Sequence, residues 1–322
     1  MPDRGAPRTL TTVRGVRLGH AEGPGARTGV TCLVFDRPAP TVVDVRGGAS
    51  GTFDTASLAL DATFGLRSAL FFAGGSLFGL DAARGVRERL LEEGKGVEVF
   101  GNPHRIVPIS GAILFDLPGR GVALPDYRLL GRDAVRRASR GPVPLGRRGA
   151  GAGALVGKYL GRKRAAPGGV GSASEELATG GAVGVLVVLN SVGAVRDPST
   201  GRWLAGPTAS DGSILPPGGG PRDARRARQA RGTTLVAVVV DAPMGREVLQ
   251  RLCVAAHDGL ARSIVPCHTP YDGDVVFASG TARGGAGRPR EPPGAVADRT
   301  GPVVTRLVER SVLRAVGADG SR

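Results

Sequence analysis

The sequence predicts a layered α/β fold in which helices cover the outer faces of β-sheets. Strongly apolar runs of strand length alternate along the chain with segments whose apolar residues recur at helical spacing. Apolar residues make up 41% of the 322 residues, enough for the large core that such layers enclose. The 53 glycines and 24 prolines flank the apolar runs, so they mark turns and close backbone contacts instead of a disordered chain.

Strands are expected where β-branched and aromatic residues run between turn signals. These segments are residues 29–36, 40–48, 67–75, 105–117, 181–195, 233–241 and 272–281. The prolines of the fourth segment fit a sheet edge or the beginning of a strand. Several neighbouring strands could pair antiparallel, which favours a sandwich of sheets.

Helices are expected where apolar residues recur every three or four positions. These segments are residues 76–94, 126–140, 244–264 and 302–317. Residues 197–232 are rich in Pro, Gly, Asp, Ser and Arg and show no period. We expect them to form a long loop, and long loops in compact proteins tend to be functional or disordered.

The formal net charge is +15, and 40 of the 43 basic residues are arginine. Such a balance could suit nucleic acid. The arginines are scattered, however, and aromatic residues make up only 4% of the chain, which leaves few stacking platforms for bases. A compositional bias toward arginine explains the charge better, so we predict no nucleic-acid partner.

The three cysteines, Cys32, Cys253 and Cys267, show no CxxC spacing, and their odd number argues against a disulfide framework. The first residues lack an apolar core typical of a signal peptide, and no run of 18 apolar residues is present. The sequence therefore predicts a cytoplasmic protein with no membrane partner.

Common ligand motifs are incomplete in this chain. The segment GAGALVGKY has Ala152 where a phosphate loop needs its first glycine, and Tyr159 follows the lysine. The segment GGSLFG has Ser76 in place of the second glycine of a dinucleotide loop, and Phe78 where a nucleophile elbow needs glycine. The four histidines show no metal-ligand spacing, so no metal site is predicted.

Polar side chains at the ends of apolar segments form the remaining candidate site. They are Thr233 at the beginning of a strand, Lys158 after a glycine-rich segment, Asn190 where a buried strand turns, and the pair Asp272 and Asp274 around a glycine. Carboxylates two positions apart at a strand start can project to the same side. Each residue also has an ordinary structural explanation, as a strand threonine, a solvated lysine, a strand-ending asparagine or a turn tripeptide.

Taken together, these residues lie in sequence blocks that resemble a known family. The blocks, in order, are VRGVRLGHAEGPGARTGVTCLVF, DVRGGASGTFDT, LFFAGGSLFGLDAARGV, VPISGAILFDL, GAGALVGK, VLNSVGAV, GTTLVAVVVDA and HTPYDGDVVFA. They resemble the self-processing peptidases that include L-aminopeptidase/D-esterases, β-peptidyl aminopeptidases and nylon-oligomer hydrolases. The resemblance runs from about residue 12 to 317, nearly the whole chain.

The resemblance implies an N-terminal-nucleophile hydrolase with a four-layer αββα sandwich, formed by residues 1–322 as a single domain. Members of this family fold as a precursor and then cut themselves before a Ser or Thr. Here the cut falls between Gly232 and Thr233, which gives an α chain of 1–232 and a β chain of 233–322. The resemblance also implies that α/β heterodimers assemble into a tetramer or a larger oligomer.

Site roles follow from the resemblance, position by position. Thr233 becomes the nucleophile, Lys158 matches the lysine of the catalytic cluster, and Asn190 matches the asparagine near the oxyanion. Asp272 and Asp274 match the acidic pair of the nylon-hydrolase type, where the aminopeptidase type has Ser and Glu.

Three departures from the family pattern bear on specificity. Gly232 precedes the cut, as in the D-esterase type, where the nylon hydrolases have Asn. Phe115, a candidate for the substrate pocket, stands where some members have a tyrosine, so any hydroxyl role there is lost. Residues 110–117 contain no glutamate that could hold a substrate α-amine, so strict aminopeptidase specificity is not expected.

An N-terminal threonine suits this chemistry because it carries nucleophile and base on one residue. Its free α-amine has an unperturbed pKa of ~7.7–8.0 and can take the hydroxyl proton near neutral pH. We therefore expect a self-cleaving hydrolase of a small peptide or amide oligomer that needs no metal or organic cofactor. Two alternatives stay open: an acyltransferase using the same threonine, and a non-catalytic basic relative that binds nucleic acid.

Overall fold

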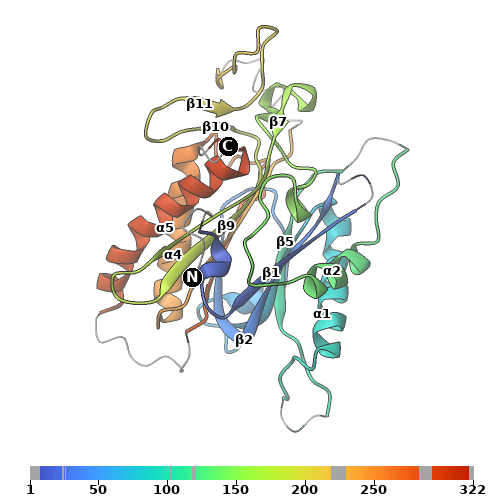
Figure 1. Cartoon of the computed structure of the whole chain (residues 1–322), viewed down its shortest axis with the longest axis vertical. Helices are drawn as coiled ribbons and strands as arrows, with labels where there is room; N and C mark the ends of the chain where they lie inside the picture. Colours follow the sequence, from blue (N-terminus) through green and yellow to red (C-terminus); the bar gives the residue numbers. More distant parts are fainter. Residues whose placement is uncertain are drawn as a thin grey trace.

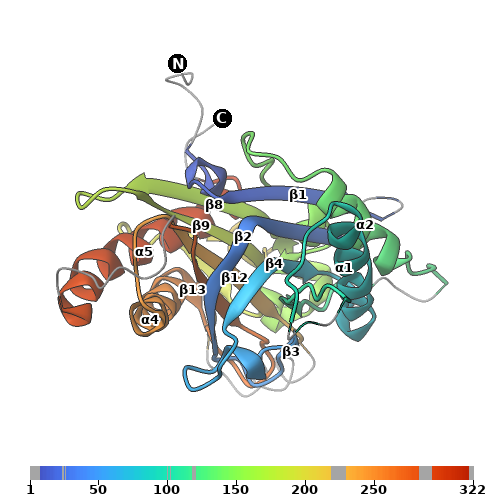
Figure 2. The ribbon, with the colours of Figure 1, turned by 90° about the horizontal axis from the view of Figure 1, so that it is seen from below.

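The computed structural model describes residues 8–318 apart from 24, 26, 100, 102, 118–120, 219–229 and 283–291. Two layers of strands lie between two layers of helices, with α4 and α5 on one side and α1 and α2 on the other (Figures 1 and 2). The predicted four-layer αββα sandwich is confirmed. The helices are α1 (Ala82–Glu92), α2 (Tyr127–Arg136), α4 (Arg246–Ser263) and α5 (Pro293–Ala315).

The main sheet has nine strands in the order β3-β5-β4-β2-β14-β12-β9-β8, with β1 paired to β2. These strands are β1 (Val16–Glu22), β2 (Gly29–Val45), β3 (Gly51–Phe53), β4 (Leu66–Ala73), β5 (Ile109–Ile113), β8 (Gly169–Glu176), β9 (Ala182–Asn190), β12 (Thr233–Val240) and β14 (Val275–Gly280). Five short strands form two further ladders: β6 (Leu155–Val156) with β7 (Ala166–Pro167), and β10 (Ala194–Arg196) with β11 (Trp203–Ala205) and β13 (Ile264–Val265).

Strand β2 connects the two strand layers. Its first part pairs with β1 and β4, and its last part, Thr41–Val45, pairs with β14. The sequence suggested two strands, 29–36 and 40–48, but the structure joins them. Pro38 lies within the register shift between Val34 and Ala39, where its missing N–H interrupts the ladder without ending the strand.

Strand β12 is buried on both faces, which explains its unbroken apolar sequence. Leu235, Ala237 and Val239 belong to the core between the two strand layers. The alternate residues Val236, Val238 and Val240 belong to the core beneath α4 and α5. A third core lies between β4, β5 and the helices α1 and α2. The strand that begins at Thr233 is therefore held by packing on both sides.

Several strands were not anticipated from the sequence, and the longest of them are β1 and β8. The sequence of β8 is GVGSASEE, which lacks the usual large apolar residues. Its small residues allow α5 to lie close, because a Cβ on Gly171 would be 1.8 Å from the Ser311 carbonyl oxygen. The small residues of β8 are thus explained by the backbone of α5, which packs closely against this strand.

The remaining differences concern boundaries. Helix α5 begins at Pro293, before the expected residue 302, and Pro302 lies inside it. Residues 76–94 begin with the 3-10 helix Ser76–Asp81 and continue as α1. The expected loop 197–232 contains β11, while its arginine-rich part at 219–229 lies outside the described residues.

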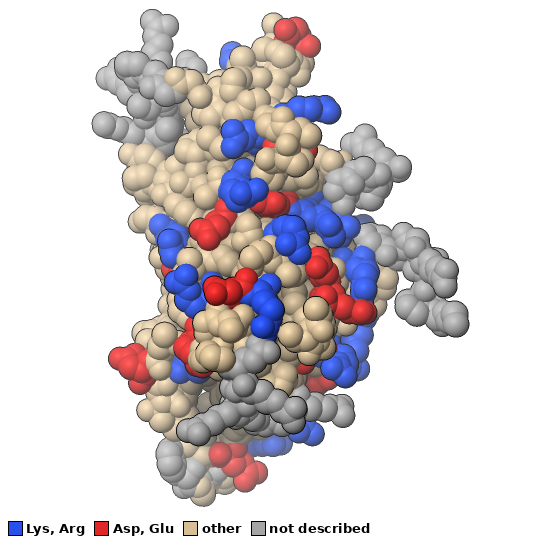
Figure 3. Space-filling model, turned by 90° about the vertical axis from the view of Figure 1, so that its left-hand side faces the viewer, with Lys and Arg blue, Asp and Glu red and all other residues tan. Residues whose placement is uncertain are grey.

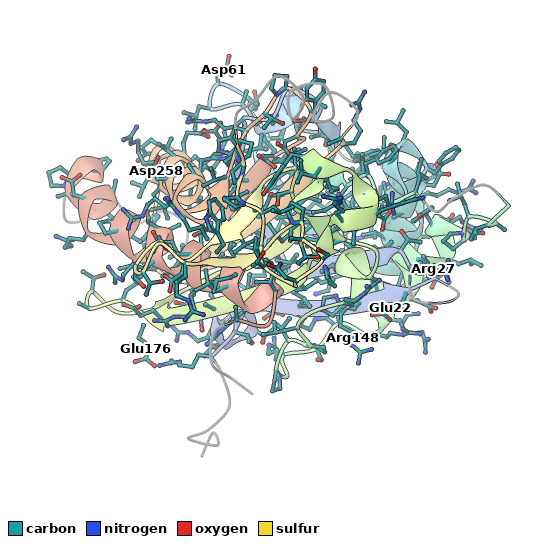
Figure 4. The ribbon with its side chains drawn as sticks, turned by 90° about the horizontal axis from the view of Figure 1, so that it is seen from above. Glu22, Arg27, Asp61, Arg148, Glu176 and Asp258 are labelled. Carbon is teal, nitrogen blue, oxygen red and sulfur yellow. The ribbon has the colours of Figure 1, made fainter. Side chains whose placement is uncertain are left out.

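The charged side chains labelled in Figure 4 lie at the periphery. Figure 4 shows Glu22, Arg27 and Arg148 along one margin of the molecule, Glu176 farther along it, and Asp61 at the opposite margin. On the face drawn in Figure 3, basic and acidic side chains are interspersed. Among the described residues, no helix has both the length and the apolar character needed to cross a membrane.

Candidate active site

Thr233 is the first residue of β12 and is 3% exposed. It lies opposite Asn190, the last residue of β9, in the antiparallel ladder. Its Oγ1 donates a hydrogen bond to the carbonyl oxygen of Gly232, the residue just before it. The same oxygen accepts a hydrogen bond from the N–H of Gly273, at 3.0 Å. Two donors, the buried Thr233 hydroxyl and the Gly273 N–H, thus contact the carbonyl of the peptide bond at which the resemblance implies cleavage.

Gly232 occupies a position where a side chain does not fit. A Cβ built there would lie 2.1 Å from Asp272 Oδ1 and 2.5 Å from the Val192 nitrogen. These two atoms are themselves joined by a hydrogen bond of 3.0 Å. The glycine therefore lets this carboxylate and its backbone partner pass directly beside the Gly232–Thr233 bond.

Asp272 and Asp274 are both 1% exposed and precede β14. Asp272 Oδ2 accepts from the Thr269 hydroxyl at 2.6 Å. Asp274 Oδ1 accepts from the Thr234 N–H at 2.6 Å, and its Oδ2 lies 2.8 Å from His268 Nδ1. Both carboxylates thus hold the backbone around Thr233, while their effect on Lys158 is electrostatic.

Lys158 reaches the same region from the segment between β6 and β7. Gly157 adopts a left-handed conformation, with φ of +72°, which turns the chain before the lysine. The lysine Nζ donates to Asn190 at two points, 2.6 Å to the backbone oxygen and 3.0 Å to Oδ1. Burial lowers its pKa to about 7, although Asp272 acts in the opposite direction.

Asn190 is held at both ends of its side-chain amide. Its Oδ1 accepts from Leu155 N–H at 3.0 Å as well as from Lys158. Its Nδ2 donates to the Phe115 carbonyl oxygen at 3.1 Å, which leaves its second N–H as a possible donor. The amide is therefore fixed in orientation opposite Thr233.

Asp272 is the second group here with a shifted pKa. Burial and then the neighbouring Asp274 raise the pKa of Asp272 to about 6, while the Thr269 hydroxyl and Lys158 act to lower it. The site therefore contains a lysine and an aspartate whose pKa values are brought close to neutrality from opposite directions. Such pairs are typical of catalytic sites, though ion-pair networks also produce them.

A cavity of about 510 Å³ opens beside these residues. Phe115 lies on its wall together with Lys158 and Asn190, and its side chain is 38% exposed. The structure thus brings every residue of the predicted site to one place: Thr233, Gly232, Lys158, Asn190, Asp272 and Asp274 at the strand ends, and Phe115 in the adjoining cavity.

Several contributors were not singled out from the sequence. Thr269 and His268 each hold one of the two carboxylates, and Gly273 supplies the backbone donor to the Gly232 carbonyl. All three lie in the block HTPYDGD, so the signal was present but only its aspartates were chosen. Every residue except proline has a backbone N–H, so the residue type does not mark such a donor in the sequence. This explains why Gly273 was not predicted.

One group of described residues has donor atoms close enough for a metal ion: Cys267, His268 and Asp274, within 4.8 Å of one another. His268 Nδ1 lies 2.8 Å from Asp274 Oδ2, while His268 Nε2 is buried with no hydrogen-bond partner among the described residues. Burial raises the pKa of the Cys267 thiol, and we assign no step to a metal there.

Comparisons with known proteins agree with this geometry. A model of Peptidase family S58 matches residues 8–320, almost the whole chain. The chain belongs to peptidase family S58. It is 37% identical over 289 residues to an uncharacterized aminopeptidase of Mycobacterium tuberculosis, covering 85% of this chain and 81% of that protein. The S58 chain is also 32% identical over 271 residues to a 6-aminohexanoate-oligomer endohydrolase of Kocuria sp., covering 82% and 72%.

Solved structures show the same fold at lower sequence identity. The L-aminopeptidase D-Ala-esterase/amidase from Ochrobactrum anthropi, described as a variant of the Ntn hydrolase fold, superposes with a TM-score of 0.65 at 20% identity. That match covers 98% of the S58 chain and 88% of the other. A β-aminopeptidase of Burkholderia sp. gives a TM-score of 0.62 at 23% identity, covering 98% and 89%. The chain therefore has the Ntn-hydrolase fold of that structure, and as a member of peptidase family S58 it is a hydrolase of the peptidase type.

Proposed function

We propose that this S58 chain is a self-cleaving amide hydrolase whose nucleophile is Thr233. The observation that supports this most strongly is the Thr233 hydroxyl, buried and hydrogen-bonded to the carbonyl of the residue before it. A threonine that only begins a strand does not need this contact. Here the Gly232 carbonyl accepts from the Thr233 hydroxyl and also from the Gly273 N–H. The Gly232–Thr233 bond is the one we expect to break, which gives chains of 232 and 90 residues.

Self-cleavage begins when Thr233 Oγ1 attacks the Gly232 carbonyl carbon, and the proton lost by the hydroxyl is the one that the Thr233 nitrogen gains when the C–N bond breaks. The negative charge that develops on the carbonyl oxygen is stabilised by the Gly273 N–H, which already donates to it. The C–N bond then breaks as the nitrogen takes up a proton, leaving an ester between Gly232 and Thr233. Water hydrolyses that ester, and Thr233 is left with a free amine and a free hydroxyl.

The mature enzyme then uses both groups of Thr233. The α-amine accepts the hydroxyl proton, and the hydroxyl attacks a substrate amide to give an acyl ester on Thr233. The free N–H of Asn190 stabilises the oxyanion, a contribution of typically ~3–4 kcal/mol. Lys158, when protonated, lowers the pKa of the nearby amine and keeps it basic and neutral. Asp272 and Asp274 hold the surrounding backbone and balance the lysine charge.

The substrate class follows from the relatives together with this chemistry. Relatives are named as aminopeptidases and as 6-aminohexanoate-oligomer endohydrolases, and both names describe cleavage of amide bonds. We propose that this chain cleaves small peptides or linear amides by the acyl-enzyme route above. Water is the acceptor in this proposal, so product analysis in the presence of an added amine distinguishes it from acyl transfer.

The decisive experiment is a denaturing gel of the purified protein with N-terminal sequencing of any smaller band. We expect a band whose sequence begins TTLVAVVV and which is missing from the Thr233→Ala variant, together with loss of amide hydrolysis. Thr233→Ser, which keeps a hydroxyl, should retain both reactions at a reduced rate. Full hydrolytic activity in Thr233→Ala would rule out this mechanism.

A further inference from the structure

The cavity beside Thr233 lies on the acyl side of the bond that is cut. Ala230 and Arg231 immediately precede Gly232, and both line this cavity. Because a hydrolase keeps the acyl part of its substrate on the nucleophile, the uncut chain places its own acyl part in this space. The cavity therefore shows which acyl groups the mature enzyme can accept, provided the proposed function holds.

Four residues of the lining are apolar: Phe115, Leu155, Leu160 and Ala230. Ala230 is buried in a small cluster with Tyr159, Val192 and Ala194, against which Leu160 and Trp203 also pack. A linear aliphatic segment of a substrate would gain free energy from occupying this position, at ~0.8 kcal/mol per buried CH₂ group.

The lining also carries positive charge. Arg162, Lys163 and Arg164 form a 3-10 turn between β6 and β7, and all three line the cavity and are exposed. Arg231 lies on the wall as well, with its guanidinium 5.3 Å from the centre of the Tyr271 ring. No aspartate or glutamate is among the described residues of this lining.

Among the described residues, no carboxylate forms an ion pair within 4 Å of Arg162, Lys163 or Arg164. Arg162 donates to the backbone oxygen of Asp116 at 3.3 Å, and its charge acts at longer range on the Asp116 carboxyl. The carboxylate of Asp116 is buried and accepts from the Gly75 N–H. Arginines on the outer helices differ, since Arg132 on α2 pairs with Glu92 on α1 at 2.8 Å.

We propose that this cavity selects amides whose acyl part is an apolar linear chain ending in a carboxylate. The aliphatic portion takes the place of Ala230, and the carboxylate faces the turn of Arg162, Lys163 and Arg164. Guanidinium groups suit this ligand because their fork of N–H donors matches a carboxylate. From the described residues of the lining, a terminal ammonium in the same place would meet only like charge, so an aminoacyl group is disfavoured.

Three 4-nitroanilides of equal acyl length test the assignment on the processed enzyme. The adipoyl, hexanoyl and 6-aminohexanoyl compounds end in a carboxylate, a methyl group and an ammonium, and each releases 4-nitroaniline. We expect kcat/KM to fall in that order, with at least a tenfold span, about 1.4 kcal/mol, at low ionic strength. The span should shrink at higher salt, because exposed charges are screened.

A matched pair of variants identifies the residues responsible. Arg162→Gln combined with Arg164→Gln should reduce the ratio of kcat/KM for adipoyl over hexanoyl several-fold. Arg306→Gln, which removes an arginine paired with Glu175 on the outer face of the fold, should leave that ratio unchanged. Calorimetric binding of adipate to the processed protein should weaken in the first variant only, a readout that does not depend on turnover.

The possible outcomes separate this proposal from the proposed function. Faster cleavage of the 6-aminohexanoyl compound, or equal rates for all three, would overturn the carboxylate assignment and leave the hydrolase intact. Failure of the processed protein to cleave any of the three compounds would count against the hydrolase and the assignment together. If the double variant keeps the preference for the adipoyl compound, another group must bind the carboxylate. That result would overturn the role proposed for the turn of Arg162, Lys163 and Arg164.

Discussion

The N–H of Gly273 donates to the carbonyl oxygen of Gly232 across 3.0 Å, so the turn that holds Asp272 and Asp274 contacts the peptide bond beside Thr233. A Cβ on Gly273 would lie 2.8 Å from Thr233 Oγ1. The turn therefore approaches the Thr233 hydroxyl and the Gly232 carbonyl oxygen at the same time. Four predictions follow from this arrangement and from the groups around it.

Replacement of Gly232 by alanine should slow self-cleavage by at least about tenfold, equivalent to about 1.4 kcal/mol. The new Cβ would displace Asp272 Oδ1 or the Val192 nitrogen, since both lie within 2.5 Å of its ideal position. The rate is followed as the loss of full-length chain on a denaturing gel. Gly141→Ala is the control, because its Cβ would meet only Ser139 Oγ at 3.5 Å, and a similar slowing there would contradict the explanation.

Asn190→Asp and Asn190→Ala together test the oxyanion role. Aspartate keeps the acceptor for the Leu155 N–H and for Lys158 but removes both amide donors. If donation to the oxyanion is what matters, kcat for amide hydrolysis should fall by about 10²–10³ in both variants. Near wild-type turnover in Asn190→Asp would show that the side chain serves only to anchor its neighbours.

Thr269→Val should change the pH dependence of self-cleavage. The Thr269 hydroxyl donates to Asp272 and lowers the pKa of that carboxyl, which burial otherwise raises, to give a value of about 6. Loss of ~1.4 kcal/mol of this interaction would raise the pKa of Asp272 by about one unit. A larger fraction of Asp272 would then be protonated at pH 6, and the rate of self-cleavage at that pH should fall about fivefold. The rate at pH 8 should change much less, and Thr269→Ser should restore the original profile.

Lys158→Met should alter stability in a pH-dependent way. The pKa of Lys158 is about 7 in the folded chain, below its ordinary value of 10.5, so between these values the unfolded chain binds more protons. Wild-type stability therefore rises from pH 7 to 10.5, and the cost of burying the lysine is greatest below pH 7. Compared with the lysine form, the methionine variant should therefore gain the most unfolding free energy at pH 6 and the least at pH 10.

Urea unfolding in a Thr233→Ala background provides the measurement, because the chain then stays uncut at every pH. The quantity to compare is the difference in unfolding free energy between the two forms. A difference that does not vary between pH 6 and 10 would mean that the lysine keeps its ordinary pKa in the folded protein.

Much of the fold could be predicted because its signals are local. The apolar run after Thr233 and the helical spacing of 244–264 each gave an element close to the observed β12 and α4. Elements shaped by distant partners were not predicted in the same way. Strand β8 has a Gly- and Ser-rich sequence because α5 packs on it, and β2 continues through Pro38 because its neighbours hold both parts.

The sequence by itself determined the residue types of the candidate site, their order along the chain and the family to which it belongs. Only the tertiary structure decided how they meet: Lys158 contacts Asn190 instead of Thr233, the aspartates hold backbone N–H groups, and Gly273 faces the Gly232 carbonyl. The physical reason is that hydrogen bonds and desolvation depend on distance and burial, and those are set by the packing of strands far apart in the chain.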